Sequence, residues 1–322
     1  MTVRSERVLH RPIGRFAPSP TGPLHFGSLV AAVGSYLDAR AAGGQWLLRI
    51  EDVDRPRALP GVADQQIRVL AAYGFEWDGA IVRQSARSAI YQAALEQLAA
   101  SGQVYPCTCT RSQLAAAAGA RSGIDGLVYP GHCSDWAPGQ HVPDGAAWRF
   151  RVPGGHVGFE DRVCGHTEQD LAHDVGDFPL LRADGCFTYQ LAVVVDDLAQ
   201  GVTDVVRGAD LIDSTPRQIA VMHALGGRIP RYAHLPIVTN PAGEKLSKQT
   251  RAPAIPFDNA SERVGQLWDA LAFLGQRPDP QLRQASQEAF WAWAIAHWNL
   301  GAVVSSGRQS PSGVTGDKAI GH

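Results

Sequence analysis

The sequence predicts an α/β fold in which a doubly wound parallel sheet of the Rossmann type is interrupted by an inserted module and followed by a short C-terminal helical region. Short apolar segments alternate with segments of helical periodicity in the first hundred residues and again after residue 187. The alternation breaks between residues 106 and 186, where Cys, Gly, Pro and His are frequent. Two amphipathic segments lie beyond residue 257.

The first half of the predicted sheet occupies residues 10–105. A strand at 13–16 leads through a Pro- and Gly-rich turn into a helix marked by Leu29, Val33, Tyr36 and Leu37, which Gly43 and Gly44 close. A buried strand at 46–50 and helices at 62–73 and 88–100 follow. Strands that alternate with helices of this length imply right-handed crossovers between parallel strands.

The alternation resumes in residues 187–256, the second half of the predicted sheet domain. It contains apolar segments at 187–195 and 202–207, a helix at 215–225 with Pro216 in its first turn, and a strand at 235–239. A strand-like segment at 148–152 lies in the inserted module, 106–186. Helices near 262–274 and 285–298 form the C-terminal region, 257–300, and the Ser- and Gly-rich tail 301–322 is expected to be disordered.

The composition is that of an ordinary globular protein. The chain has 322 residues, of which 45% are hydrophobic and 19% charged, and its 29 Lys and Arg nearly balance 31 Asp and Glu. This balance excludes a broadly basic, non-specific nucleic-acid binder but not a local basic face. The Arg-containing N-terminus lacks the apolar core of a signal peptide, and no run is long enough to span a membrane. A cytoplasmic location without membrane contact is therefore expected.

The first chemical motif runs from Gly22 to Ser28, at the junction of a strand and a helix. A helix N-terminus offers free N–H groups and the positive end of a dipole to a phosphate. Gly22 and Gly27 allow the backbone to approach a ligand closely, and His25 can donate to a phosphate oxygen. By itself this signal is weak, because a lone His near a helix start is more often structural.

The second motif, from Lys245 to Gln249, lies more than 200 residues later, after a predicted strand and a turn. Two lysines beside a small hydroxyl residue can neutralise charge on a transferring phosphoryl group. An isolated pair of this kind is usually an exposed loop. Two such motifs at the carboxyl edge of one parallel sheet, however, indicate a ligand site there.

These motifs together resemble the signatures of class I aminoacyl-tRNA synthetases. The segment Arg15–Ser28 is similar to the His-containing signature of the glutamyl branch, and Lys245–Gln249 to its lysine signature. Segments 49–52 and 201–211 match the same branch, so the resemblance covers about residues 15–274. Ser28 stands where the ideal signature has a second His, and Gln249 where the lysine signature ends in Ser.

The resemblance implies a site that activates an amino acid with ATP and Mg²⁺. His25 and Lys248 would be the catalytic residues. The residues implied in ATP binding are Gly22, His25, Gly27, Ser28, Lys245, Ser247 and Lys248. The same resemblance identifies L-glutamate as the amino acid, with Arg15 and Arg207 on its carboxylate groups, Glu51 on its ammonium, Tyr189 supplying a hydroxyl, and Ala17 and Ser19 lining the pocket. A guanidinium group suits this role because it pairs with a carboxylate through two hydrogen bonds.

The acceptor is indicated by the length of the chain, since only 73 of the 322 residues follow Gln249. This shape resembles the truncated glutamyl-queuosine tRNA(Asp) synthetase family, whose members attach glutamate to the queuosine base in the anticodon loop of tRNA(Asp). A monomer is expected. The alternatives are charging of the 3′ end of tRNA(Glu), an ATP-dependent ligase or nucleotidyltransferase for small molecules, and a non-catalytic, zinc-stapled RNA-binding module.

The chain contains five cysteines, an odd number that favours metal binding in a reducing compartment over a disulfide framework. Cys107, Cys109 and Cys133, with one further donor, would form the tetrahedral site that zinc prefers. The family resemblance makes Tyr129 that donor, whereas His132 is the more conventional ligand. One structural Zn²⁺ per chain is expected in the inserted module, and Cys164 and Cys186 are expected to be small buried residues.

Overall fold

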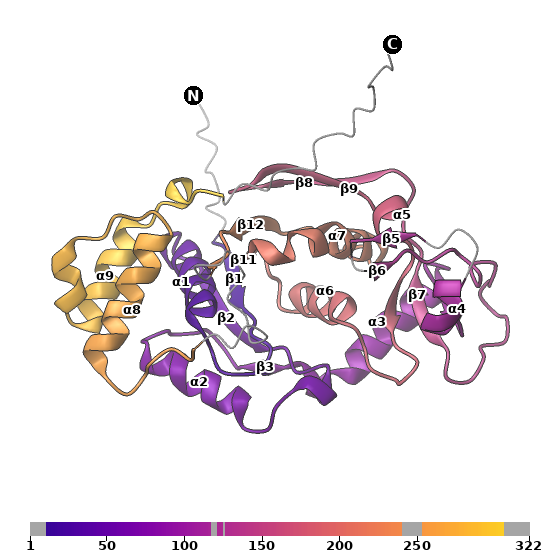
Figure 1. The fold of residues 1–322 in the computed structure, drawn as a ribbon, viewed down its shortest axis with the longest axis horizontal. Coiled ribbons are helices and arrows are strands. Elements are labelled where there is room, and N and C mark those ends of the chain that lie inside the picture. Colours follow the sequence, from indigo (N-terminus) through magenta and orange to yellow (C-terminus); the bar gives the residue numbers. More distant parts are fainter. Residues whose placement is uncertain (1–10, 117–120, 125, 240–252, 306–322) are drawn as a thin grey trace, which may run out of the picture.

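A parallel sheet lies at the centre of the molecule in the computed structural model, which describes residues 11–116, 121–124, 126–239 and 253–305 (Figure 1). Strands β1 (Ile13–Phe16), β2 (Gln45–Ile50) and β3 (Val82–Arg83) are parallel, and so are β11 (Asp204–Gly208) and β12 (Arg231–Leu235). Thr203 joins the two groups, because its backbone N–H donates to the carbonyl of Ile13 at 2.9 Å and its hydroxyl accepts from the N–H of Ile13 at 2.8 Å. The predicted α/β fold with parallel strands is confirmed.

Five helices surround these strands and form two cores. Helix α1 (Phe26–Ala41) packs on β1, β2 and β11, with α2 (Val62–Ala72) in the same core. Helices α3 (Ser88–Ala100), α6 (Tyr189–Ala199) and α7 (Thr215–Ala224) contribute to a second core. Helix α1 passes so close to β12 that a Cβ atom at Gly34 would lie 2.5 Å from a methyl group of Leu235. Glycine in mid-helix is therefore explained by this close approach.

The inserted module builds its own antiparallel sheet from β4 (Val104–Cys107), β7 (Ala147–Phe150) and β10 (Phe178–Leu181). Around it lie α4 (Arg111–Ala116), the two short strands β5 (Ser122–Gly123) and β6 (Gly126–Leu127), and α5 (Leu171–Asp174). A long hairpin of β8 (His156–Asp161) and β9 (Gly165–Asp170) returns to the central sheet, where β8 pairs in parallel with β12 (Figure 1). The insert is thus joined to the central strands by a shared sheet.

The C-terminal helices α8 (Ala260–Phe273) and α9 (Gln287–His297) pack against α1 at one end of the molecule (Figure 1). Phe290 of α9 is fully buried in the first core, and Trp291 donates its indole N–H to the carbonyl of Tyr73 at 3.0 Å. Val303 is buried, and residues 306–322 lie outside the described part of the chain. The short 3₁₀ helices are η1 (Arg55–Arg57), η2 (Gln84–Ala86), η3 (Ala209–Ser214), η4 (Pro280–Gln284) and η5 (Leu300–Ala302).

Two sequence-based expectations are wrong. The strand expected at 235–239 runs instead from Arg231 to Leu235, because Pro236 has no N–H to continue the ladder. Cys164 and Cys186 are only half-buried, since each lies in a tight connection that follows a strand. Of the two apolar segments at the start of the second half, the first forms α6 and the second β11.

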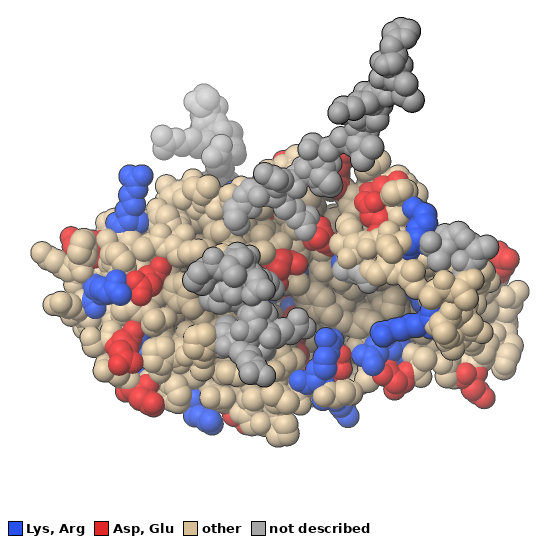
Figure 2. All heavy atoms as spheres, in the orientation of Figure 1, with Lys and Arg blue, Asp and Glu red and all other residues tan. Residues whose placement is uncertain are grey.

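The surface carries charges of both signs. Figure 2 shows Lys and Arg interspersed with Asp and Glu on one face, which is hollowed to the right of centre. This pattern agrees with the formal net charge of −2. None of the helices in the described ranges combines the length and the apolar character that crossing a bilayer requires.

Candidate active site and metal centre

A cleft of about 1080 Å³ opens at the carboxyl ends of β1, β11 and β12, beside the first turns of α1 and α6. Most of the residues predicted to bind glutamate line it, namely Ala17, Ser19, Glu51, Tyr189 and Arg207. His25, Gly27 and Ser28 from the predicted ATP site line the same cleft. Arg15 and Gly22 are buried behind its wall, and Lys245, Ser247 and Lys248 lie outside the described residues.

His25 caps the N-terminus of α1 and shares its hydrogen bonds with Ser28. The imidazole Nδ1 accepts from the backbone N–H of Ser28 at 3.2 Å, and the Ser28 hydroxyl accepts from the backbone N–H of His25 at 3.4 Å. This reciprocal arrangement is a capping box with a histidine in place of the usual hydroxyl or carboxylate side chain. Because Nδ1 is an acceptor, the ring proton is on Nε2, which makes this nitrogen a hydrogen-bond donor. The serine that departs from the ideal signature therefore has a structural role.

Gln66 of α2 holds the loop before this helix, and sequence analysis did not identify it. Its amide nitrogen donates to the carbonyl of Gly22 at 2.8 Å and to that of Ser19 at 3.2 Å. The side chain is fully buried and also lines the cleft. A lone glutamine in an amphipathic helix carries no motif, so no local signal predicts this contact.

The segments that flank the lysine motif both reach the cleft. On the N-terminal side, Ile237 and Val238 line it. On the C-terminal side, Ala254 forms an isolated β-bridge with His25, and the N–H of Ile255 donates to the carbonyl of Leu24 at 3.0 Å. The described residues on both sides of the lysine motif therefore lie close to the cleft and the histidine motif.

Alternating charges form a buried network beneath the cleft. Asp197 of α6 accepts from Arg49 at 2.8 Å and from Arg15 at 3.3 Å. Arg49 also contacts Glu51 at 3.4 Å. Such a network fixes the positions of its members, since each would be costly to bury unpaired. Sequence analysis identified Arg15 and Glu51 but missed Asp197, which the chain places nearly 150 residues beyond Glu51.

The pKa values of Glu51 and Asp197 shift in opposite directions, although both side chains are largely shielded from solvent. Burial raises the pKa of the Glu51 carboxyl group, and Arg49 and Arg15 only partly offset this effect. Burial also acts on Asp197, but Arg15 and Arg49 outweigh it and the net pKa is lowered. Asp197 is thus a permanent anion of the network. Glu51, which faces the cleft, is the carboxylate that a cation in the cleft would stabilise.

Arg207 of β11 has its guanidinium group fixed by neighbouring side chains. The Nε–H donates to Nε2 of His234 at 3.1 Å, and one terminal nitrogen donates to the Thr215 hydroxyl at 2.8 Å. The other terminal nitrogen donates to the Tyr189 hydroxyl at 3.3 Å. Arg207 is 5% exposed and lines the cleft, so a buried, oriented cation faces the same space as Glu51. This combination suits a ligand that carries both an anionic and a cationic group.

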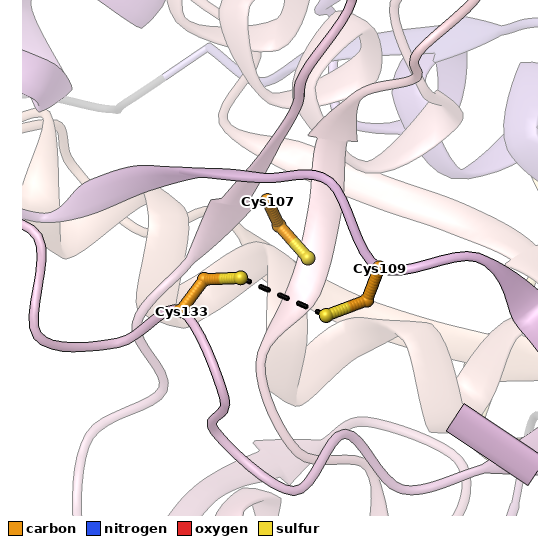
Figure 3. A group of neighbouring side chains, drawn as sticks. All are labelled: Cys107, Cys109 and Cys133. Carbon is orange, nitrogen blue, oxygen red and sulfur yellow. Dashed lines mark hydrogen bonds between the residues drawn. The ribbon is translucent and has the colours of Figure 1, made fainter. Parts of the chain in front are cut away.

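Three cysteines lie close together in the inserted module (Figure 3), and the Tyr129 side chain contacts two of them. The sulfur atoms of Cys107, Cys109 and Cys133 all lie within 4.8 Å of one another, with 3.6 Å between Cys109 and Cys133. The Tyr129 hydroxyl oxygen lies 3.4 Å from the sulfur of Cys107 and 3.8 Å from that of Cys109. Ligand atoms around a tetrahedral zinc ion at about 2.0 to 2.3 Å would be about 3.5 to 3.8 Å apart. The donor set therefore fits a metal ion.

His132 is exposed and does not belong to this group of close ligand atoms among the described residues. Tyr129 is buried, and its oxygen also accepts from the backbone N–H of Cys133 at 2.9 Å. The guanidinium carbon of Arg149 lies 4.0 Å from the centre of the Tyr129 ring. A nearby cation of this kind balances the negative charge that several anionic ligands bring to a metal site.

Residues 13–271 match the family model described as the catalytic domain of class I tRNA synthetases (E and Q). The chain belongs to this family. As a class I synthetase, it is a ligase of a family that uses ATP, an amino acid and tRNA.

Several curated relatives of this synthetase share one name. Glutamyl-Q tRNA(Asp) synthetase of Chromobacterium violaceum is 57% identical over 298 residues, which cover 92% of this chain and 97% of the relative. The protein of that name from Aromatoleum aromaticum is 54% identical over 312 residues, covering 93% and 96%. That of Pseudomonas aeruginosa strain PAO1 is 52% identical over 287 residues, covering 89% and 93%.

Solved structures of glutamate–tRNA synthetases share the fold of this synthetase. The enzyme from Elizabethkingia anophelis superimposes with a TM-score of 0.72 at 25% identity, over 92% of this chain and 67% of that one. A glutamate–tRNA ligase from Elizabethkingia meningosepticum, in complex with its amino acid, gives a TM-score of 0.74 at 25% identity, over 92% and 66%. The chain thus spans about two thirds of these longer synthetases.

Proposed function

We propose that this synthetase activates L-glutamate with ATP, without tRNA, and transfers the glutamyl group to the queuosine base in the anticodon loop of tRNA(Asp). The observation that carries the proposal is the single cleft, which joins a histidine-capped helix N-terminus to an oriented arginine and a buried carboxylate. The first feature suits a phosphate chain and the second suits a substrate with a carboxylate side chain and an ammonium group.

In the first step, an oxygen of the glutamate α-carboxylate attacks the α-phosphorus of ATP and the bond to pyrophosphate breaks. His25 donates from Nε2 to a phosphate oxygen, and the free N–H groups of α1, including that of Gly27, face the phosphates. Glu51 accepts from the substrate ammonium, while Arg207 and Tyr189 bind the side-chain carboxylate. Arg15, tethered to Asp197, adds positive charge behind the substrate. Catalysis then rests on positioning and on charge stabilisation.

Lys248 supplies a cation to the reacting α-phosphate of ATP, with Lys245 and Ser247 on the same motif. The support is positional, because the flanking residues Val238 and Ala254 both lie at the cleft. Lys248 precedes Ala254 by six residues, a length that spans at most about 20 Å when fully extended. Mg²⁺ would accompany ATP and neutralise its phosphates.

The inserted module, residues 106–186, would carry one structural zinc ion held by Cys107, Cys109, Tyr129 and Cys133. Four protein ligands leave no open position for a substrate, so the metal would hold the module together. We assign this module to acceptor binding and residues 10–105 and 187–256 to the catalytic domain. A cytoplasmic monomer is the expected form of the enzyme.

The acceptor is assigned from the curated relatives, which cover nearly the whole chain and bear the name glutamyl-Q tRNA(Asp) synthetase. In the second step, a hydroxyl group of the modified base attacks the carbonyl carbon of glutamyl-adenylate, and AMP leaves. The competing proposal is esterification of the 3′ end of tRNA(Glu), which the names of the solved structures suggest.

The deciding experiment measures glutamate-dependent ATP–pyrophosphate exchange without RNA, and then transfer of radiolabelled glutamate to purified tRNAs. We expect exchange in the absence of RNA and label only on queuosine-containing tRNA(Asp), within its anticodon loop. Queuosine-free tRNA(Asp) is the matched control acceptor. Label at the 3′ end of tRNA(Glu) would establish the competing function, and absence of exchange would favour a non-catalytic RNA-binding protein.

Replacing the catalytic lysine should separate chemistry from binding. Lys248→Ala should lower the kcat of exchange by about 100-fold or more, because one stabilising cation in a preorganised site contributes about 10²–10³. Equilibrium binding of glutamate, measured by calorimetry, should change much less. An equal loss in kcat and in glutamate affinity would contradict this role. Lys318→Ala, in the C-terminal tail, is the control for the loss of a lysine.

A further inference from the structure

Behind Arg207 lies a buried chain of hydrogen bonds that the proposed reaction does not use directly. His234 of β12 is the register partner of Arg207 on the neighbouring parallel strand, so the two side chains lie next to each other. Asp161, the last residue of β8, lies on the far side of His234, and its carboxylate oxygen Oδ2 is 2.6 Å from the imidazole Nδ1. Neither side chain is exposed to solvent.

We propose that Asp161 and His234 are positioning residues for glutamate recognition: Asp161 fixes the tautomer of His234, and His234 in turn fixes the orientation of the Arg207 guanidinium group. The proposal rests on the proposed function, because it takes Arg207 as the group that binds the substrate side chain. Because Asp161 belongs to the inserted module, the proposal gives this module a part in amino-acid recognition.

The two carboxylate oxygen atoms of Asp161 have different hydrogen-bond partners. Oδ1 accepts from three backbone N–H groups, those of Val163 at 2.9 Å, Cys164 at 2.8 Å and His234 at 3.2 Å. Oδ2 is thereby directed to the imidazole. Burial opposes ionisation of Asp161, but the hydrogen bond from His234 and those from the backbone outweigh it and lower the pKa to about 2. Asp161 is therefore a carboxylate at neutral pH and can only accept.

The tautomer of His234 follows from this. Burial lowers the pKa of its imidazole, against the opposing effect of Asp161, so the ring is neutral near pH 7 and carries one proton. That proton must be on Nδ1, since it faces an acceptor-only carboxylate. Nε2 then has a lone pair, which accepts the Nε–H of Arg207 at 3.1 Å and also faces the Thr215 hydroxyl at 3.2 Å.

Fixing Nε–H fixes the plane of the whole guanidinium group. Arg207 is held at Nε by His234 and at one terminal nitrogen by Thr215 and the carbonyl of Leu211. The remaining terminal nitrogen, which contacts the Tyr189 hydroxyl, is the one directed to the substrate side. A fixed guanidinium offers only donors to the ligand. The two oxygen atoms of a side-chain carboxylate both accept from these donors. The side-chain amide of glutamine can place its NH₂ group against the guanidinium, where two donors meet. In the other orientation its neutral oxygen accepts, but more weakly than a carboxylate oxygen.

The variant Asp161→Asn tests this chain because it is isosteric. The three backbone N–H groups at Oδ1 require the amide oxygen there, so the amide nitrogen must face Nδ1 of His234 and donate to it. The imidazole proton is then forced onto Nε2, where it meets the Nε–H of Arg207. Two donors face each other, and the guanidinium must move.

In Asp161→Asn, the KM for glutamate should rise about tenfold or more, because the residue that orients the glutamate-binding arginine is lost. The KM for ATP should be nearly unchanged. The preference for glutamate over glutamine, measured in ATP–pyrophosphate exchange, should fall by a similar factor. In histidine-labelled ¹⁵N spectra, the His234 signal, assigned by its loss in His234→Phe, should change from the Nδ1–H to the Nε2–H form.

Asp204→Asn is the matched control. Asp204 is 1% exposed and lies on the same sheet as Arg207, but it is paired with Arg231 and Arg162 instead of His234. Its replacement should lower the melting temperature without changing the KM for glutamate. A double variant, Asp161→Asn with His234→Phe, should show no further rise in KM over His234→Phe alone, because the relay is already broken.

Three results would overturn the inference: an unchanged KM for glutamate in Asp161→Asn, an unchanged tautomer of His234, or an equal rise in KM in Asp204→Asn. Thermal unfolding of each variant distinguishes a folded protein with altered recognition from one that has lost its fold. If the wild type shows no glutamate-dependent exchange, the proposed function fails. The tautomer measurement still reports on the Asp161–His234 pair in that case, so the two failures are distinguishable.

Discussion

The candidate site contains two carboxylates whose surroundings give them different tasks. Asp197 forms ion pairs with Arg15 and Arg49 and stays ionised. Among the described residues, Glu51 forms an ion pair with Arg49 only, and it faces the cleft. Its raised pKa means that the protonated form is reached at a higher pH than for an exposed glutamate. Binding of a substrate ammonium group requires the charged form.

The affinity for glutamate should therefore fall as the pH drops through the raised pKa of Glu51. Above this pKa, Glu51 is ionised and its contribution to the affinity is fully present. Glu51→Gln should raise the dissociation constant for glutamate by about 10- to 100-fold, because a hydrogen bond to a charged group is lost, and should abolish this acid limb. Calorimetric titration between pH 5 and 8 measures both effects. Glu96→Gln, an exposed position on α3, is the control; an acid limb that persists in Glu51→Gln would assign it to another group.

At the scale of single elements, the part of the inserted module around the cysteines has a small core of its own. Tyr105, Cys107, Leu114 and Tyr129 are its buried members, and two of these belong to the proposed metal site. A core of this size contributes little hydrophobic stabilisation, so a metal ion held by ligands from distant parts of the loop would contribute much of the stability.

Removing one thiol should release the metal and unfold this module. We expect about one zinc per chain in the purified protein, and Cys107→Ser should lose it, as measured by elemental analysis and by limited proteolysis within residues 108–146. Cys186→Ser, a half-buried cysteine outside the cluster, should retain the metal. Tyr129→Phe should weaken zinc retention more than His132→Ala, and the reverse order would make His132 the ligand.

Elements with strong periodicity were predictable, and contacts between distant elements were not. The helices at 62–73 and 88–100 match α2 and α3 within one residue, because their apolar spacing and breaker residues are local features. The strand near 235 was misplaced because the buried Tyr232 and His234 are polar residues, which obscured its pattern in sequence. Pro236 was the one local sign of its end.

In the candidate site, only the residues that belong to sequence motifs were predictable. His25, Glu51 and Arg207 carry sequence signatures, and the structure brings all three to one cleft. Gln66 binds the motif residue Gly22 across 44 positions, and Asp161 binds His234, the neighbour of Arg207, across 73. Such partners are set by tertiary packing, which has no signature in a single sequence.

For the molecule as a whole, the C-terminal helices complete the core of the catalytic domain. Helix α9 places Phe290 against the same apolar cluster as Trp46 and Leu37 from the first half of the chain. In the part of the chain that the structure describes, this cluster is the larger of the two main cores and lies under the α1 side of the cleft.

Truncating this contact should destabilise the protein without altering recognition. Phe290→Ala should cost about 3–5 kcal/mol, as for other buried aromatic side chains, and lower the melting temperature measured by calorimetry. At 25 °C the folded fraction should keep the wild-type KM for glutamate. Glu288→Ala, exposed on the same helix, should have little effect. A changed KM in Phe290→Ala would show that α9 also shapes the substrate pocket.

The shared sheet of β8 and β12 limits how such proteins can be recombined. A hairpin whose strand β8 pairs with β12, and whose Asp161 is hydrogen-bonded to His234 on that strand, is not an interchangeable unit. A chimera that takes this hairpin from one synthetase and the nucleotide-binding halves from another would have to inherit a compatible histidine on the adjoining strand. If the insert binds the acceptor as proposed, engineering of new acceptor specificity in this scaffold would therefore begin beyond the hairpin, in the part of the insert around the cysteine cluster.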